Sequence, residues 1–229
     1  MMSNDSIKKQ VIEQFSGNAE KYVTSISHAT GPDLTELVEW LQPAPAWSLL
    51  DIATGGGHVA KTLAPHVDRV YATDLTRMML ESARRHLAPL RGNVTYVVAE
   101  ASRVLKLGGT FVLIDNISPP DPKLDQFMNT TEKMRDESHV RCYSEAEWRA
   151  WFQANGLEVK ASKIRKKTFD FPVWVKVTTR SDEQVEQVAN HLLGADAVTA
   201  EYFGIQRDGD TIRSFHIDEW MVMLQKANR

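Results

Sequence analysis

The chain has 229 residues, of which 42% are hydrophobic and 25% charged, and its formal net charge is -3. This composition is that of an ordinary globular protein of one domain, and the charge implies no general attraction to nucleic acid or anionic membranes. No apolar run reaches the roughly 20 residues of a membrane span, and the residues after Met1 contain no apolar stretch of signal-peptide type. The single cysteine, Cys142, excludes an intrachain disulfide and fits a reducing cytoplasm.

Two helices and two strands are predicted in the first third of the chain. Hydrophobic residues recur at helical spacing over residues 6–22, which predicts an amphipathic helix. A second helix is expected to begin at Pro32 and to end before Pro43. Apolar runs over residues 47–52 and 69–73 then predict two strands.

A glycine-rich turn comes directly after the first of these strands. Asp51 lies at the end of that strand, Gly55, Gly56 and Gly57 come next, and Asp74 ends the second strand 19 residues after Gly55. Glycines let a ligand approach the backbone closely, and an acid at the end of the second strand can accept hydrogen bonds from ribose hydroxyls. This strand, turn, helix and strand form the half-fold that binds nucleoside cofactors.

Beyond Asp74 the chain alternates between helices and strands and ends in antiparallel elements. Helices are predicted over residues 76–87, 144–154 and 181–193, strands over 93–99, 110–115, 157–169 and 220–226, and a hairpin of 202–206 with 211–216 around Asp208-Gly209. This order predicts an α/β fold with a doubly wound, mostly parallel sheet and a C-terminal antiparallel hairpin.

Several motifs together resemble the class I S-adenosylmethionine-dependent methyltransferases, in particular the small-molecule enzymes related to the ubiquinone and menaquinone C-methylases. The turn from Asp51 to Gly57 matches the acid-x-Gly-x-Gly-x-Gly loop of that family. Ala53 replaces its first glycine, a change that fits if this position has a negative φ angle. The other matching segments are Phe15-Ser16-x-x-Ala19-x-x-Tyr22, which would close over the cofactor, and Arg103-Val104-Leu105-Lys106-x-Gly108-Gly109, before the fifth strand.

The resemblance implies a Rossmann-like fold, S-adenosyl-L-methionine as cofactor and a small-molecule acceptor in the cytoplasm, with neither nucleic acid nor membrane as partner. We expect a single domain over residues 1–229, with a helical lid over 1–45 and the core over 46–229, and we leave a homodimer open. The cofactor-binding residues that it implies are Tyr22, Asp51, Ala53, Gly55, Gly57, Asp74, Leu75, Met78 and Glu100.

Candidates for catalysis and acceptor binding lie outside the turn. His28 and His139 are candidate general bases, because imidazole changes charge near neutral pH. Asn116 and Arg135 are candidate substrate ligands, because substrate loops of this architecture follow the strand over residues 110–115. A capping histidine and a solvated charged helix are the structural alternatives. The histidines show no metal-binding spacing, so we expect no metal.

Two alternative functions stay open. Gly55-x-Gly57-x-x-Ala60 also fits a dinucleotide-binding fingerprint, which would suit an NAD-dependent oxidoreductase, although the chain contains no Tyr-x-x-x-Lys pair. The other alternative is a non-catalytic cofactor-binding remnant or scaffold. It arises because only ten residues, Glu100 to Gly109, separate two expected parallel strands, and such a crossover usually needs a dozen or more.

The short connection implies that a fourth strand and its helix are missing between Glu100 and Ala101. Elements of common length would occupy roughly 35 to 45 residues there. We expect that these two residues are not joined by a peptide bond in the native protein. A chain that is continuous at this point would have a truncated sheet and would favour the remnant.

Overall fold

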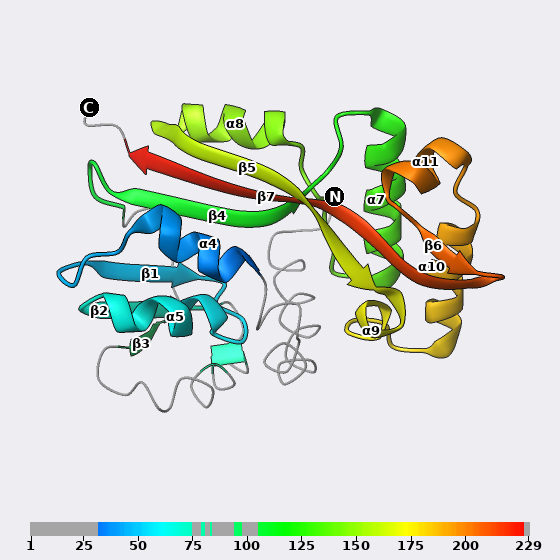
Figure 1. The fold of residues 1–229 in the computed structure, drawn as a ribbon, viewed down its shortest axis with the longest axis horizontal. Helices are drawn as coiled ribbons and strands as arrows, with labels where there is room; N and C mark the ends of the chain where they lie inside the picture. Colours follow the sequence, from blue (N-terminus) through cyan, green and yellow to red (C-terminus); the bar gives the residue numbers. More distant parts are fainter. Residues whose placement is uncertain (1–31, 75–78, 81–82, 84–93, 98–104, 227–229) are drawn as a thin grey trace. The chain divides into compact units, whose positions relative to one another are not determined.

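The computed structural model describes residues 32–74, 79–80, 83, 94–97 and 105–226 (Figure 1). The chain forms two compact units, residues 1–103 and 104–229. The expected helix over 6–22 and most of the expected helix over 76–87 lie outside the described residues. Within the described ranges, no helix is both long enough and apolar enough to cross a membrane.

The described part of the first unit is a parallel sheet with short helices. Its elements are α4 (Pro32–Leu41), β1 (Ser48–Ile52), α5 (His58–Leu63), the 3-10 helix η1 (Ala64–His66), β2 (Arg69–Thr73) and β3 (Val94–Val97). The strand order is β1-β2-β3, with Ser48 opposite Arg69 and Val70 opposite Val94. Buried small residues, among them Ala60, Ala64 and Ala72, let the helices approach the strands closely.

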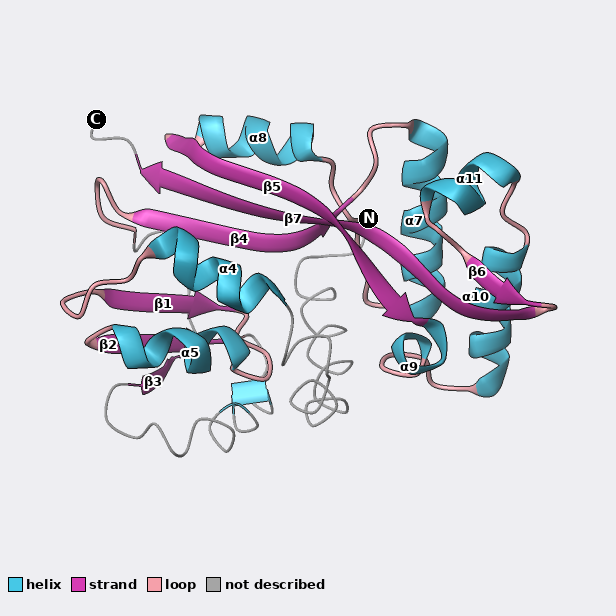
Figure 2. Ribbon diagram, viewed as in Figure 1, coloured by secondary structure: helices cyan, strands magenta, loops and turns pink. Residues whose placement is uncertain are grey.

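The second unit combines a mixed sheet with five helices among its described residues (Figure 2). Its elements are β4 (Thr110–Ile117), α7 (Pro122–Arg135), α8 (Glu145–Ala154), β5 (Leu157–Asp170), α9 (Phe171–Val175), α10 (Asp182–Leu193), α11 (Ala197–Tyr202), β6 (Gln206–Asp208) and β7 (Thr211–Lys226). The sheet order is β4-β7-β5, and β7 runs antiparallel to both neighbours as well as to β6.

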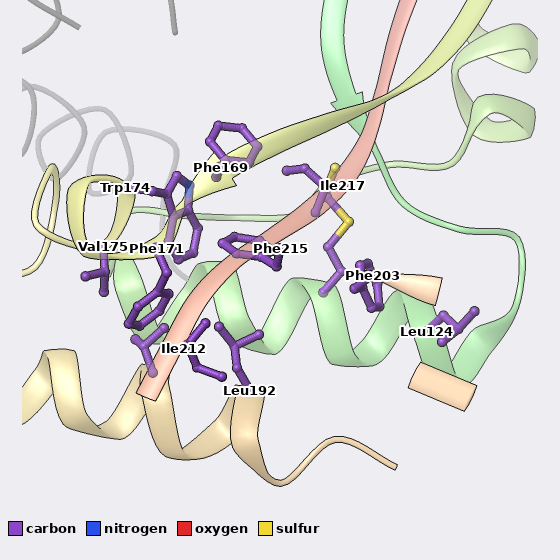
Figure 3. Packing of buried hydrophobic residues seen from close by; sticks show 13 residues of the cluster. Leu124, Phe169, Phe171, Trp174, Val175, Leu192, Phe203, Ile212, Phe215 and Ile217 are labelled. Carbon is purple, nitrogen blue, oxygen red and sulfur yellow. The ribbon is translucent and has the colours of Figure 1, made fainter. Parts of the chain in front are cut away.

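The long strands β5 and β7 connect two hydrophobic clusters of this unit. In the first cluster, Trp220 of β7 is fully buried, stacks on Phe152 of α8 at 5.9 Å between ring centroids, and donates from Nε1 to Ser162 Oγ at 2.8 Å. In the second cluster, drawn in Figure 3, Phe215 of β7 lies edge-on to Trp174 of α9 at 4.7 Å. Residues from one strand therefore contribute to both clusters.

Capping residues correctly predict where two helices begin. Ser144 caps α8, and its hydroxyl accepts from the amide of Glu147 while the Glu147 carboxylate accepts from the amide of Ser144. Ser181 caps α10, and its hydroxyl accepts from the amide of Gln184. Such caps satisfy amides that have no partner inside the helix, so their positions follow directly from the residue types.

Some strand bounds expected near the end of the chain were wrong. The residues expected as a strand over 202–206 include the end of α11, and the strands expected over 211–216 and 220–226 are one continuous strand, β7. Between them lie Asp218 and Glu219, which the sequence pattern did not place in a strand. Asp218 pairs with Lys166 at 3.0 Å, and Glu219 pairs with Arg165 and Lys167 of β5. Cross-strand ion pairs of this kind allow charged residues to continue a sheet.

Three further side chains have an exposure that their residue types alone do not suggest. Trp151 of α8 is 42% exposed although its side chain is large and mainly apolar. Arg165 and Lys167, although charged, keep only 20% and 19% of their side-chain surface exposed beside buried Glu219. The opposite charge compensates for their partial removal from water.

Among the described strands, β1 pairs with β2 alone and β4 pairs with β7 alone. The fourth strand expected next to the first strand has no counterpart in these residues. Glu100 and Ala101 lie outside the described residues, so the expectation that no peptide bond joins them stays a prediction.

Candidate functional site

The glycine-rich turn follows β1 and is held against the end of β2. The amide of Thr54 donates to the carbonyl of Thr73 at 2.8 Å, and the amide of Gly57 donates to the carbonyl of Thr54 at 2.8 Å. Gly55 and Gly57 have φ angles of 51° and 81°, in the left-handed region that glycine adopts without penalty. These two positions therefore need glycine for the shape of the turn.

Ala53 also has a left-handed backbone, with a φ angle of 55°. The expectation that its replacement of the family's first glycine is accommodated by a negative φ angle is wrong. A residue with a Cβ atom loses roughly 1–2 kcal/mol in this conformation. The bond from the neighbouring Thr54 amide to Thr73 keeps the turn in place, so the shape is retained despite the substitution.

Asp51 fixes the turn from inside. Its Oδ2 accepts from the hydroxyl of Thr54 at 2.7 Å and from the amide of Ala60 at 3.1 Å. Burial raises the pKa of the Asp51 carboxyl to about 6; these two hydrogen bonds act against the rise, and the charge of Asp74 adds to it. The structure thus gives Asp51 a role in connecting β1, the turn and α5.

Asp74 lies beside the turn, immediately after β2. Its Oδ2 accepts from the amide of Gly55 at 3.1 Å, so the two positions 19 residues apart are in direct contact. The side chain is half-buried. Because a carboxylate offers about four acceptor sites, the bond from Gly55 is compatible with further bonds from a vicinal diol. The expected juxtaposition of acid and glycine turn is therefore present.

Several candidate residues fall outside the described residues. They are Tyr22, His28, Leu75, Met78 and Glu100. Their expected roles in cofactor binding and catalysis stay predictions.

In the second unit, Arg135 packs α7 against α9. Its Nη2 lies 2.9 Å from Oε2 of Glu132, and its guanidinium carbon lies 4.2 Å from the centre of the Trp174 ring. Only 14% of its side-chain surface is exposed. This geometry supports a packing role, and a role in substrate binding stays a prediction.

His139 and Asn116 belong to one hydrogen-bonded group. His139 Nε2 lies 3.1 Å from Oδ1 of Asn129, which also accepts from the amide of Cys142 at 2.6 Å. The thiol of Cys142 donates to the carbonyl of Asn116 at 2.9 Å. The end of β4, α7 and the segment before α8 thus bring together two residues that the sequence nominated separately.

The half-buried position of His139 determines its charge. Burial lowers the pKa of the imidazole; the negative charges of Glu132 and Asp136 act in the opposite direction, and the positive charges of Lys133 and Arg135 add to the lowering. The net direction is downward, so the ring is mainly neutral at pH 7. A neutral imidazole is the form that a general base requires.

Asp115 is an ionisable residue to which the sequence pattern assigned no role. The residue is exposed as a whole, yet protein atoms crowd its carboxyl group, and desolvation raises its pKa to about 6. The amide of Asn116 opposes this rise from 2.8 Å, and the charges of Glu219 and Glu132 add to it. Perturbed carboxyl groups of this kind are common at functional sites, and only the fold reveals the acidic neighbours.

No group of His, Cys, Asp or Glu side chains suited to a metal ion occurs within residues 32–74, 79–80, 83, 94–97 and 105–226.

Comparison with known proteins gives three findings. Residues 49–134 match a family described as a methyltransferase domain. The chain is 30% identical over 224 residues to the uncharacterized methyltransferase YcgJ of Bacillus subtilis, covering 83% of this chain and 88% of the relative. The crystal structure of YcgJ superposes with a TM-score of 0.81 at 25% identity and covers 86% of this chain and 99% of that one.

A more distant structural match shows the fold alone. It is an S-adenosylmethionine-dependent methyltransferase from Geobacter sulfurreducens in complex with S-adenosyl-L-homocysteine, with a TM-score of 0.53, 15% identity, and coverage of 92% of this chain and 96% of that one. Together the matches confirm the α/β fold class with Rossmann-like architecture. They favour methyl transfer over the NAD-dependent alternative.

Proposed function

We propose that this chain transfers a methyl group from S-adenosyl-L-methionine to a small-molecule acceptor. The chain belongs to the methyltransferase family. The observation that carries the proposal is the contact between the Asp74 carboxylate and the amide of Gly55 at the glycine turn. This contact lies at the carboxyl ends of two neighbouring parallel strands. It places an acceptor for a ribose diol beside a backbone that a ligand can approach closely.

The chemistry of the turn suits this cofactor. When bound, S-adenosyl-L-methionine supplies an electrophilic methyl group on a sulfonium centre. Asp74 would accept hydrogen bonds from the ribose hydroxyls, and Gly55 and Gly57 would bring the backbone close to the ligand. Asp51 would act through the turn, because its carboxyl oxygen already accepts from Thr54 and Ala60.

His139 is the proposed general base in the described part of the chain. Its neutral imidazole can take a proton from an oxygen acceptor or an activated carbon acceptor as the methyl group arrives. An acceptor that is already a good nucleophile would need little more than alignment with the methyl group and exclusion of water. Dependence of the reaction on His139 therefore distinguishes these acceptor classes.

A labelling experiment tests the proposed acceptor class. The purified chain is incubated with methyl-labelled S-adenosyl-L-methionine and a cell extract separated into ultrafiltrate, protein and nucleic acid. We expect labelled product in the ultrafiltrate, and none with Asp74→Ala. Label in the protein or nucleic acid fraction would contradict the small-molecule acceptor. Absence of labelled product, as distinct from unreacted cofactor, from every fraction would favour the non-catalytic remnant.

A further inference from the structure

Asn129 of α7 holds the backbone of Cys142 from both sides. Its Nδ2 donates to the carbonyl of Cys142 at 3.2 Å, while its Oδ1 accepts from the amide of the same residue at 2.6 Å. Nδ2 also donates to Oδ1 and to the carbonyl of Asp125, at 2.8 and 3.1 Å. One side chain thus connects the helix to the segment that carries His139.

These partners determine which end of the Asn129 amide is oxygen. A reversed amide would place its NH2 group against the N–H of Cys142 and its oxygen against the carboxylate of Asp125. Donor would then face donor and acceptor would face acceptor, and several hydrogen bonds would be lost at once. The atom that faces His139 is therefore the carbonyl oxygen.

The orientation of the amide determines the tautomer of the imidazole. An amide oxygen cannot donate, so His139 Nε2, 3.1 Å away, must carry a hydrogen. A neutral imidazole has one N–H, which leaves the lone pair on Nδ1. We infer that Asn129 is a positioning residue that fixes His139 as the Nε2–H tautomer and makes Nδ1 the basic nitrogen.

This inference rests on the proposed function in one respect, because it assigns the proton-accepting atom of the proposed base. In the proposed step, the acceptor's proton would move to Nδ1 while the acceptor's electron pair forms the new bond to the methyl carbon. The bond from that carbon to the sulfonium sulfur would break, and its electron pair would stay on the sulfur of the departing S-adenosyl-L-homocysteine. The imidazole then carries hydrogens on both nitrogens, and Nε2–H remains bonded to Asn129. Asn129 itself neither gains nor loses a proton.

The charged surroundings of His139 favour an uncharged partner at this position. Glu132 and Asp136 favour the imidazolium, whereas burial, Lys133 and Arg135 disfavour it. A carboxylate in place of the Asn129 amide would add a third negative charge and stabilise the imidazolium before the acceptor binds. The neutral amide fixes the tautomer of His139 without stabilising the imidazolium in this way.

The tautomer can be measured by nitrogen NMR on the intact chain with labelled histidine and without cofactor or acceptor. The His139 signals are assigned from their loss in His139→Gln. At neutral pH we expect a protonated Nε2 and an unprotonated Nδ1 in the unmodified protein. A protonated Nδ1 would overturn the inference, and this result is read from the unmodified protein, with folded His139→Gln used only for the assignment.

Two variants then test the role of Asn129. Asn129→Ala should give averaged signals of both tautomers, and Asn129→Asp should keep the Nε2–H tautomer while moving the titration of His139 to higher pH. Asn190→Ala, at an exposed asparagine of α10, is the matched control and should change neither. Unchanged His139 signals in both Asn129 variants would contradict a positioning role.

The outcomes separate this inference from the proposed function. If the tautomer is as inferred but His139→Gln transfers methyl groups at the normal rate, the proposed base is wrong and the positioning stands. If His139→Gln is slow but Nδ1 carries the proton, the base stands and the positioning is wrong.

Discussion

The glycine turn and the His139 group are built from the sequence in two different ways. The bonds from Thr54, Gly55 and Ala60 to the carboxylates of Asp51 and Asp74 lie within one strand–turn–helix–strand segment. The His139 group instead combines the end of β4, the middle of α7 and the segment before α8. The first is a contiguous motif, whereas the second depends on how separate elements pack.

This difference explains why the glycine turn is recognisable from sequence and the His139 group is not. A short contiguous motif can be matched residue by residue. A group whose members come from several elements has no fixed spacing, and its chemistry depends on burial and on neighbouring charges. Substitutions in the two units should accordingly act on different properties.

The largest expected effect concerns the long strands of the second unit. Trp220→Ala should lower the free energy of unfolding by about 3–5 kcal/mol, because Trp220 is fully buried and stacks on Phe152. Trp151→Ala is the matched control, since Trp151 is 42% exposed, and should cost about 1 kcal/mol or less. Denaturant unfolding followed by circular dichroism measures both. Equal losses would show that β7 does not hold the cluster together.

The next effect concerns ligand binding at the turn. Two hydrogen bonds to a carboxylate contribute on the order of 3 kcal/mol, so Asp74→Ala should weaken S-adenosyl-L-methionine binding at least about 100-fold. Asp68→Ala removes an exposed acid just before the same strand and should leave the affinity unchanged. Equilibrium dialysis compares the two variants. Unchanged affinity in folded Asp74→Ala would remove Asp74 from the site.

Much of the contiguous motif could be predicted from sequence, and so could the caps at Ser144 and Ser181. The helices α7, α9 and α11 were missed, although each begins after an aspartate cap, at Asp121, Asp170 and Asp196. Those caps were a usable local signal. The continuity of β7 was not predictable in this way, because Asp218 and Glu219 continue the strand only beside the basic residues of β5.

The buried acid of the turn, Asp51, should make its own contribution to the pH dependence of stability. Burial raises the pKa of Asp51 from 3.8 to about 6, so the folded state binds this proton more tightly than the unfolded state. Its contribution to stability is therefore greatest below about pH 4, declines by about 2–3 kcal/mol as the pH rises to about 6, and is level above that.

Asp51→Asn, which keeps an acceptor for Thr54 and Ala60, should remove this part of the pH dependence. Chemical unfolding of both proteins between pH 4 and 7 measures the difference. Parallel curves for the two proteins would mean that Asp51 titrates normally.

The smallest effect concerns the strained alanine. Ala53→Gly should raise the free energy of unfolding by about 0.5–1 kcal/mol, because relief of the left-handed strain exceeds the entropy that glycine loses on folding. Ala60→Gly, inside α5, should instead lower stability by about 1 kcal/mol. Thermal unfolding gives the sign of each change. A loss of stability in Ala53→Gly would contradict the strain.

The central claim is that this chain binds S-adenosyl-L-methionine through the glycine turn and Asp74. The most direct test is a calorimetric titration of the intact, folded chain with S-adenosyl-L-methionine. We expect a saturable heat with one site per chain and a micromolar dissociation constant. A folded chain that gives no heat of binding would contradict this claim and would support a remnant of the family that no longer holds its cofactor.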